Sequence, residues 1–229
     1  MVKIRRTGPE RGQSVNVLLD NFALFRHGFI GTVVLTAVSA VLSLVLGTLV
    51  AACRVSPVPP LRIFGTVWVT LLRNTPLTLL FMIAVFVAPQ ILFPGISYFT
   101  LAVSALGCYT SAFVCEALRS GVNSVPLGQA EAARSLGMTF SQTLRLIVLP
   151  QATRTVIPPI GSLMIALTKN SAIAGSFNVA ELFAQQKRLS EIGYNILEIF
   201  VWIALAYLVI TFAISALFRL LEHRLAVAR

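Results

Sequence analysis

Acidic residues, histidines and cysteines are scarce in this chain. Its 229 residues include 8 aspartates and glutamates, 2 histidines and 3 cysteines. His27 and His223 lie near the two ends, and neither a Ser-His nor a His-x-x-x-His arrangement occurs. A catalytic site needs a nucleophile beside a base, and a metal site needs clustered ligands. The sequence therefore predicts no catalytic residues and no metal site, and it disfavours an enzyme.

A phosphate-binding loop is also lacking. No Gly-x-x-x-x-Gly-Lys-Ser/Thr element occurs, so we do not expect the chain to hold ATP phosphates in the usual P-loop manner. Cys53, Cys108 and Cys115 fall in or beside apolar runs and show no metal-ligand spacing. We interpret them as small packing residues rather than as a disulfide or a reactive thiol.

Apolar residues are abundant instead. Hydrophobic residues make up 57% of the chain, charged residues 11%, and the mean hydropathy is +0.86. This composition predicts an all-α integral membrane protein that crosses the bilayer several times. The formal net charge is +10, but the basic residues are spread over loops and ends. That distribution favours contact with anionic lipid headgroups and acidic partners. It does not predict nucleic-acid binding, which needs basic residues gathered on one face.

The hydrophobic runs predict about five membrane spans. Residues 1–27 combine basic residues with an apolar face and are expected to form an interfacial amphipathic helix. The first run is too long for a cleavable signal peptide, and its Gly31 and Gly47 are expected to let a neighbouring helix approach closely. Segment 178–195 is polar enough for an external loop with a short helix. The expected spans are about 28–53, 63–89, 97–118, 155–177 and 196–217.

Polar residues interrupt two of these spans. On insertion scales, Arg73 facing lipid at mid-bilayer costs about 2.5 to 3.5 kcal/mol, and Pro76 removes a helix hydrogen bond. We therefore expect the second span to break there, with the break facing protein or water. These interruptions either line or gate a path for solute, or brace broken helices. The candidate residues are Arg73, Asn74, Thr75, Lys169, Asn170 and Ser171.

A long polar stretch runs from Gln129 to Pro150. Gly137 suits a helix C-terminus, and Thr139 with Gln142 three residues on fits a capping box that begins a second helix. Pro150 is expected to end that helix. Two short helices joined by a tight corner are therefore predicted.

Two pairs of opposite charge have helical spacing. Glu131 and Arg134 lie about one turn apart in the polar stretch, and Glu116 and Arg119 have the same spacing at the end of the third span. Residues three apart on a helix can form an ion pair. We expect the second pair to be structural.

The polar stretch resembles the EAA loop of ABC importer permeases. The resemblance rests on Glu131, Ala132, Ala133, Gly137, Ile147, Leu149 and Pro150, which have the spacing of that loop. The sequence AFVCEALRSGVNSVPLGQAEAARSLG, the Arg73–Pro76 element and the Lys169–Asn170 pair are similar to the polar amino-acid branch of these permeases. Within it, the chain looks most like the permeases of actinobacterial glutamate uptake systems.

The resemblance implies a type I ABC importer permease fold over residues 28–220, with the coupling loop at 120–152 and a cytoplasmic tail at 221–229. It implies a second, different permease chain, two ATPase subunits that carry ATP and Mg, and an extracytoplasmic amino-acid-binding protein. No cofactor is expected on this chain. The residues expected to contact the ATPase are Glu131, Ala132, Ala133, Arg134, Gly137, Leu149 and Pro150.

Charge counting leaves the orientation open, because the basic amino-terminal segment competes with the polar stretch and the basic tail. The resemblance implies that the EAA loop is cytoplasmic, with the amino terminus outside and the carboxyl terminus inside. An ATP-independent channel or secondary transporter for small polar solutes is the alternative function. It predicts internal inverted repeats, and no convincing repeat is evident in the sequence.

Overall fold

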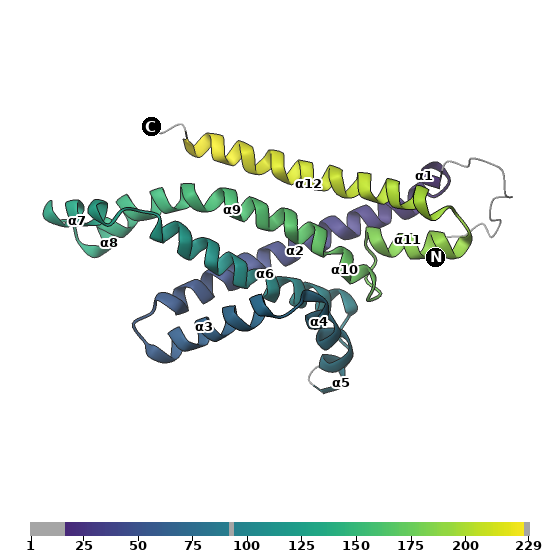
Figure 1. Ribbon diagram of the computed structural model, residues 1–229, viewed down its shortest axis with the longest axis horizontal. Coiled ribbons are helices and arrows are strands. Elements are labelled where there is room, and N and C mark those ends of the chain that lie inside the picture. Colours follow the sequence, from purple (N-terminus) through teal and green to yellow (C-terminus); the bar gives the residue numbers. More distant parts are fainter. Residues whose placement is uncertain (1–16, 92–93, 227–229) are drawn as a thin grey trace.

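The computed structural model describes residues 17–91 and 94–226, and this part of the chain is built from helices (Figure 1). Most of the expected amphipathic segment, residues 1–16, lies outside the described residues. The first helices are α1 (Val17–Asp20) and α2 (Phe22–Val55). Because α2 begins at Phe22, residues 22–27 belong to the first long helix rather than to a separate interfacial helix.

Four long helices in the described residues have the length and hydropathy of single spans, and a bent pair supplies a fifth. The single spans are Phe22–Val55, Tyr98–Asn123, Phe140–Gly175 and Ile196–Leu225. The bent pair is Pro59–Asn74 with Leu77–Ile91, at an angle of 104°. The predicted all-α membrane fold is therefore confirmed, with four to five spans.

Helix α2 packs most extensively against α6 (Tyr98–Asn123), and glycines allow the close approach. A Cβ atom placed on Gly47 would lie 2.5 Å from Val114 Cγ1. A Cβ atom on Gly31 would collide with the backbone carbonyl of Ala180, before α11. The predicted close approach of a neighbouring helix is found at Gly47, whereas at Gly31 the close neighbour is the segment that precedes α11. The core of the bundle lies along this seam, where Leu35 and Leu106 are fully buried.

The second span breaks where the sequence predicts. Helix α3 (Pro59–Asn74) ends at Thr75, whose backbone is extended (φ −101°, ψ 131°). Pro76, which has no N–H to donate, follows at once. The chain then continues as α4 (Leu77–Met82), the π-helical turn η1 (Ile83–Val87) and α5 (Ala88–Ile91). The bend turns α4 and α5 away from the long axis of the bundle (Figure 1).

The polar stretch forms the predicted helical corner. Helix α7 (Leu127–Ser135) is followed by Gly137 at φ +80°, and α8 (Phe140–Thr143) begins with a complete capping box between Thr139 and Gln142. A positive φ suits glycine because other residues clash there. The corner and both of its local signals are confirmed.

The prediction that Pro150 ends the second helix is wrong. After α8 the chain forms the π-helical turn η2 (Leu144–Val148) and then α9 (Leu149–Asn170), so that residues 140–175 read as one long helix. Pro150 lies in the first turn of α9, where a missing N–H is tolerated. The fourth span therefore starts within the polar stretch.

The remaining elements are α10 (Ala172–Gly175), α11 (Leu182–Ile192) and α12 (Ile196–Ala226). Helix α11 is the short helix expected between the last two spans, and it packs against α2 and α12. Figure 1 shows α7 and α8 at one end of the bundle, together with the end of α12. Helices α1 and α11 lie at the opposite end.

Candidate functional site

The corner formed by α7, α8 and η2 exposes an unusual amount of apolar surface. We define the coupling surface as Leu127, Leu136, Phe140 and Leu146, whose exposed fractions are 80%, 84%, 70% and 65%. Beside these residues lies a groove of about 280 Å³ whose lining includes Glu131 and Arg134. Large apolar residues that remain exposed at the end of a bundle are typical of a surface that another protein covers.

The residues predicted to contact an ATPase take different positions on this corner. Ala133 is buried at 4% exposure and anchors α7, whereas Ala132, Glu131 and Arg134 are exposed. Within the described chain no ion pair joins Glu131 to Arg134, so the predicted pair does not form. An exposed pair gains little in water because solvent and side-chain entropy compete with it. Both side chains remain available to a partner.

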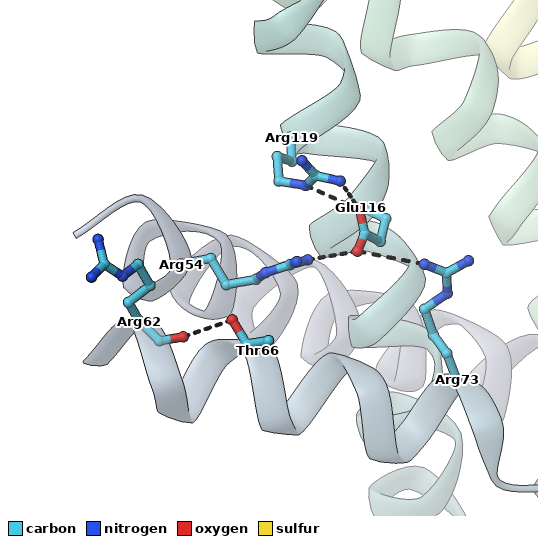
Figure 2. A network of polar contacts seen from close by, with 6 residues as sticks. All are labelled: Arg54, Arg62, Thr66, Arg73, Glu116 and Arg119. Atoms are coloured by element: carbon cyan, nitrogen blue, oxygen red, sulfur yellow. Dashed lines mark hydrogen bonds and ion pairs between the residues drawn. The ribbon is translucent and has the colours of Figure 1, made fainter. Parts of the chain in front are cut away.

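A carboxylate held by three arginines lies further along α6 (Figure 2). Arg54 Nη1 donates to Glu116 Oε1 at 2.6 Å, and Arg73 Nη1 lies 3.4 Å from the same oxygen. Arg119 Nη2 and Nε donate to Glu116 Oε2 at 2.9 and 3.1 Å. The Glu116–Arg119 pair expected from its spacing is present. One carboxylate thus ties α2, α3 and α6 together.

This cluster changes the surroundings predicted for Arg73. The guanidinium contacts Glu116 and lies over the Phe113 ring, with Cζ 5.6 Å from the ring centroid. Arg54, the partner with the shortest contact, was not predicted, because it lies 62 residues from Glu116 in sequence. Helical spacing in the sequence predicts contacts only between residues a few positions apart.

The polar residues at the break bond back to their own helix. Asn74 Nδ2 donates to the Thr70 carbonyl at 2.8 Å, and Thr75 Oγ1 donates to the Leu71 carbonyl at 2.7 Å. Each bond reaches the carbonyl four residues earlier, about one helical turn back, and so holds the side chain against the last turn of α3. Asn74 and Thr75 are therefore bonded within their own span.

Helix α9 exposes a stripe of small and polar residues, here called the polar stripe, where a lipid-facing helix would expose large apolar residues. At alternating spacings of four and three, the exposed residues are Thr155, Pro159, Ser162, Ala166 and Lys169. Helices α2 and α12 instead expose valine, leucine and phenylalanine. A charged residue inside a span faces protein or a water-filled cavity. Lys169 is the charged member of this stripe, so the stripe is a candidate for the face toward a partner chain or an aqueous path.

Lys169, Asn170 and Ser171 differ in burial. Lys169 is exposed and makes no ion pair within the described residues, whereas Asn170 is half-buried. Ser171 is fully buried, and its hydroxyl donates to the Thr168 carbonyl at 2.7 Å. Arg73 packs against α6, whereas Lys169 lies on the exposed face of α9. Of the two basic candidates, only Lys169 lacks a carboxylate partner.

A buried carboxylate, Glu181, was not predicted from the sequence. It is fully buried and accepts the Ala184 N–H at 2.7 Å, which caps the first turn of α11. Glu181 Oε2 also accepts the Tyr207 hydroxyl of α12 and lies 3.5 Å from Thr32 Oγ1 of α2. These contacts fix α11 at its end of the bundle. An acidic residue directly before a helix is an N-cap signal. The prediction for segment 178–195 is an external loop with a short helix, and it assigns no cap to Glu181.

Burial raises the pKa of Glu181 above its ordinary value. The folded chain therefore holds this proton more tightly than the unfolded chain, and stability falls as pH rises from the unfolded pKa through the raised folded value. We expect the melting temperature in detergent to decline over that window. In Glu181→Gln the decline should be shallower, whereas Glu191→Gln, an exposed change on the same helix, should leave it unchanged. An identical pH dependence in all three proteins would contradict the assignment.

Comparison with known proteins identifies the family. The family model for the binding-protein-dependent transport system inner membrane component matches residues 43–227. The chain is 39% identical to the probable glutamine ABC transporter permease protein GlnM of Bacillus subtilis, covering 93% of this chain and 98% of that one. It is 41% identical to the glutamate transport system permease protein GluC of Corynebacterium efficiens, covering 86% and 92%.

The fold agrees with these relatives. A solved structure described as a crystal structure of an amino acid ABC transporter with histidines matches with a TM-score of 0.85 and 32% identity, over 93% of this chain and 100% of that chain. The family match covers more than half of the chain, including the coupling surface and the last three spans. The chain therefore belongs to the family of binding-protein-dependent transport system inner membrane components, and it is a multi-pass permease subunit of an ABC importer.

Proposed function

We propose that this chain forms, with a second and different permease chain, the translocation path of an ATP-driven importer of polar amino acids, with glutamate as the substrate. The observation that carries the proposal is the uncovered coupling surface at the α7–α8 corner. Its exposed leucines and phenylalanine offer an apolar face that a motor subunit can cover. The chain itself has no phosphate-binding loop, so the ATPase is a separate partner.

The proposed assembly assigns one partner to each end of the bundle. Two ATPase subunits, which carry ATP and Mg, cover the corner on the cytoplasmic side. An extracytoplasmic amino-acid-binding protein delivers substrate at the end where α1 and α11 lie. This arrangement places the amino terminus outside and the carboxyl terminus in the cytoplasm. It agrees with the count of five spans when the bent pair is one span.

Glutamate is proposed for two reasons, the substrates named for related permeases and the basic residues in the spans of this chain. The related permeases named above serve glutamine and glutamate, and the spans of this chain carry basic groups that can contact a carboxylate. Reconstitution with an ATPase and a binding protein tests the proposal. Labelled glutamate should enter vesicles only with ATP, and excess unlabelled glutamate should compete better than glutamine, aspartate or arginine. Uptake by this chain without an ATPase would instead support a channel or secondary transporter.

We further propose that the polar stripe on α9 lines the path and that Lys169 contacts the substrate carboxylate. A hydrogen bond to a charged group contributes about 1.5 to 3 kcal/mol, so Lys169→Ala should reduce ATP-driven uptake by roughly tenfold or more. Assembly with the ATPase should be unaffected. Arg62→Ala, an exposed change near the start of α3, is the control and should keep normal uptake.

Arg73 provides the contrast. Because its guanidinium contacts Glu116, Arg73→Ala should lower thermal stability as well as uptake. The predicted roles of Asn74, Thr75, Asn170 and Ser171 in gating depend on the same assay. Normal uptake by both the Lys169 and Arg73 variants would show that these groups brace broken helices instead.

A further inference from the structure

A groove on the side of the bundle has no role in the proposed transport cycle. It lies between the first turns of α2, the short α1 and the first half of α12, and its volume is about 330 Å³. Each long helix contributes residues at i, i+3, i+4 and i+7, which is one helix face. The lining of the two faces is Phe22, Phe25, Arg26 and Phe29 of α2, with Trp202, Leu205, Ala206 and Val209 of α12.

The packing beneath explains the shape of the groove. Phe25 and Ile203 are buried at 5% and 3% exposure and join the two helices at its floor. Phe22 and Val209, which also line the groove, remain 58% and 60% exposed. Helix α1 closes one end of the groove, where the Val17 N–H donates to Glu198 Oε1 at 3.3 Å.

The charge at the groove is a single unpaired cation. Arg26 is exposed, and within the described chain it forms no ion pair with Asp20 of α1, Glu198 of α12 or any other acidic residue. Arg26 lies in the second turn of α2, two residues before the apolar run that the sequence predicts from Gly28. A guanidinium presents paired N–H donors that match the oxygens of a phosphate group.

We propose that this groove is a binding site for an anionic phospholipid. One acyl chain lies along Phe29, Ala206 and Val209, and the phosphate contacts Arg26. The apolar walls provide the contact for the hydrocarbon, and the arginine selects the headgroup charge. The lipid site requires only that α2 and α12 lie in the membrane. The proposal can therefore be tested separately from the identity of the transported substrate.

Tryptophan fluorescence can test this proposal directly. The chain has two tryptophans; Trp202 lines the groove, whereas Trp68 lies on α3 and donates to Ser111 Oγ at 3.0 Å. In the full-length Trp68→Phe chain, Trp202 is the reporter. We would reconstitute it in phosphatidylcholine vesicles that contain a small fraction of brominated phosphatidylglycerol or brominated phosphatidylcholine. One cation near the surface should enrich the anionic quencher about fivefold at low ionic strength.

Two further variants separate a site from general lipid contact. Arg26→Gln should remove the preference for phosphatidylglycerol, whereas Arg224→Gln, near the far end of α12, should keep it. Ala206→Phe should fill the groove and weaken quenching by both lipids. Equal quenching by the two lipids in the Trp68→Phe chain would overturn the proposal. An unchanged preference in Arg26→Gln would also overturn it, and so would an absence of quenching, which is expected if a second permease chain covers this face.

Discussion

Replacing Glu116 with alanine is expected to lower the free energy of unfolding by about 2 kcal/mol. The carboxylate balances Arg54, Arg73 and Arg119, and its loss leaves three guanidinium groups to repel one another. Breaking a buried pair costs about 3 to 5 kcal/mol, but exposed pairs contribute about 0 to 1 kcal/mol. Side-chain exposures of 17% to 46% in this cluster place the cost between those limits. Urea titration of the purified chain in detergent, followed by circular dichroism, would measure the change.

The partners of Glu116 provide graded controls. Arg119→Ala removes one exposed partner on the same helix and should cost less than about 1 kcal/mol. Arg54→Ala removes the shortest contact, which joins α2 to α6, and should have an intermediate effect. Equal losses in all three variants would show that the carboxylate has no special position in the cluster.

Gly137→Val is expected to reduce ATP-driven uptake by about tenfold or more and to release the ATPase during purification. Gly137 has φ +80°, and a residue with a side chain in that region costs about 1 to 3 kcal/mol, most for a β-branched one. The strain would change the angle between α7 and α8 and so disrupt the coupling surface. Co-purification of the ATPase and vesicle uptake would measure the effect.

Gly128→Val is a matched control for this prediction. A Cβ atom at either glycine would meet no other atom within 4 Å, so neither substitution creates a clash. The two positions differ in backbone conformation, because Gly128 lies within α7 without a positive φ. Similar losses in both variants would indicate that valine harms the contact itself rather than the corner.

Features that depend on neighbouring residues were predictable from the sequence. Pro76 after a polar pair indicated the break in the second span, and Thr139 with Gln142 indicated the start of α8. Both of these signals act through the backbone geometry of a few neighbouring residues. Gly31 and Gly47 are different: the sequence marked them as positions of close approach, but it did not show that their partners are Ala180 and Val114.

Features that depend on distant residues were not predictable in the same way. Arg54 and Glu181 become partners of groups far along the chain only when the helices pack together. Pro150 was misread because its effect depends on η2, a turn that rearranges the hydrogen bonds before it. The family resemblance indicated the coupling surface, but the contacts of Arg73 required the structure.

The helical run from Phe140 to Gly175, made of α8, η2, α9 and α10, has a mechanical consequence. Its 36 residues form a rod of about 54 Å, at 1.5 Å per residue, which starts at the surface proposed for the motor. Without a loop along its length, a rod that tilts by about 10° around its centre swings each tip by about 5 Å in opposite directions. When the motor moves the cytoplasmic end of this helical run, the opposite end would therefore move by a similar distance in the opposite direction.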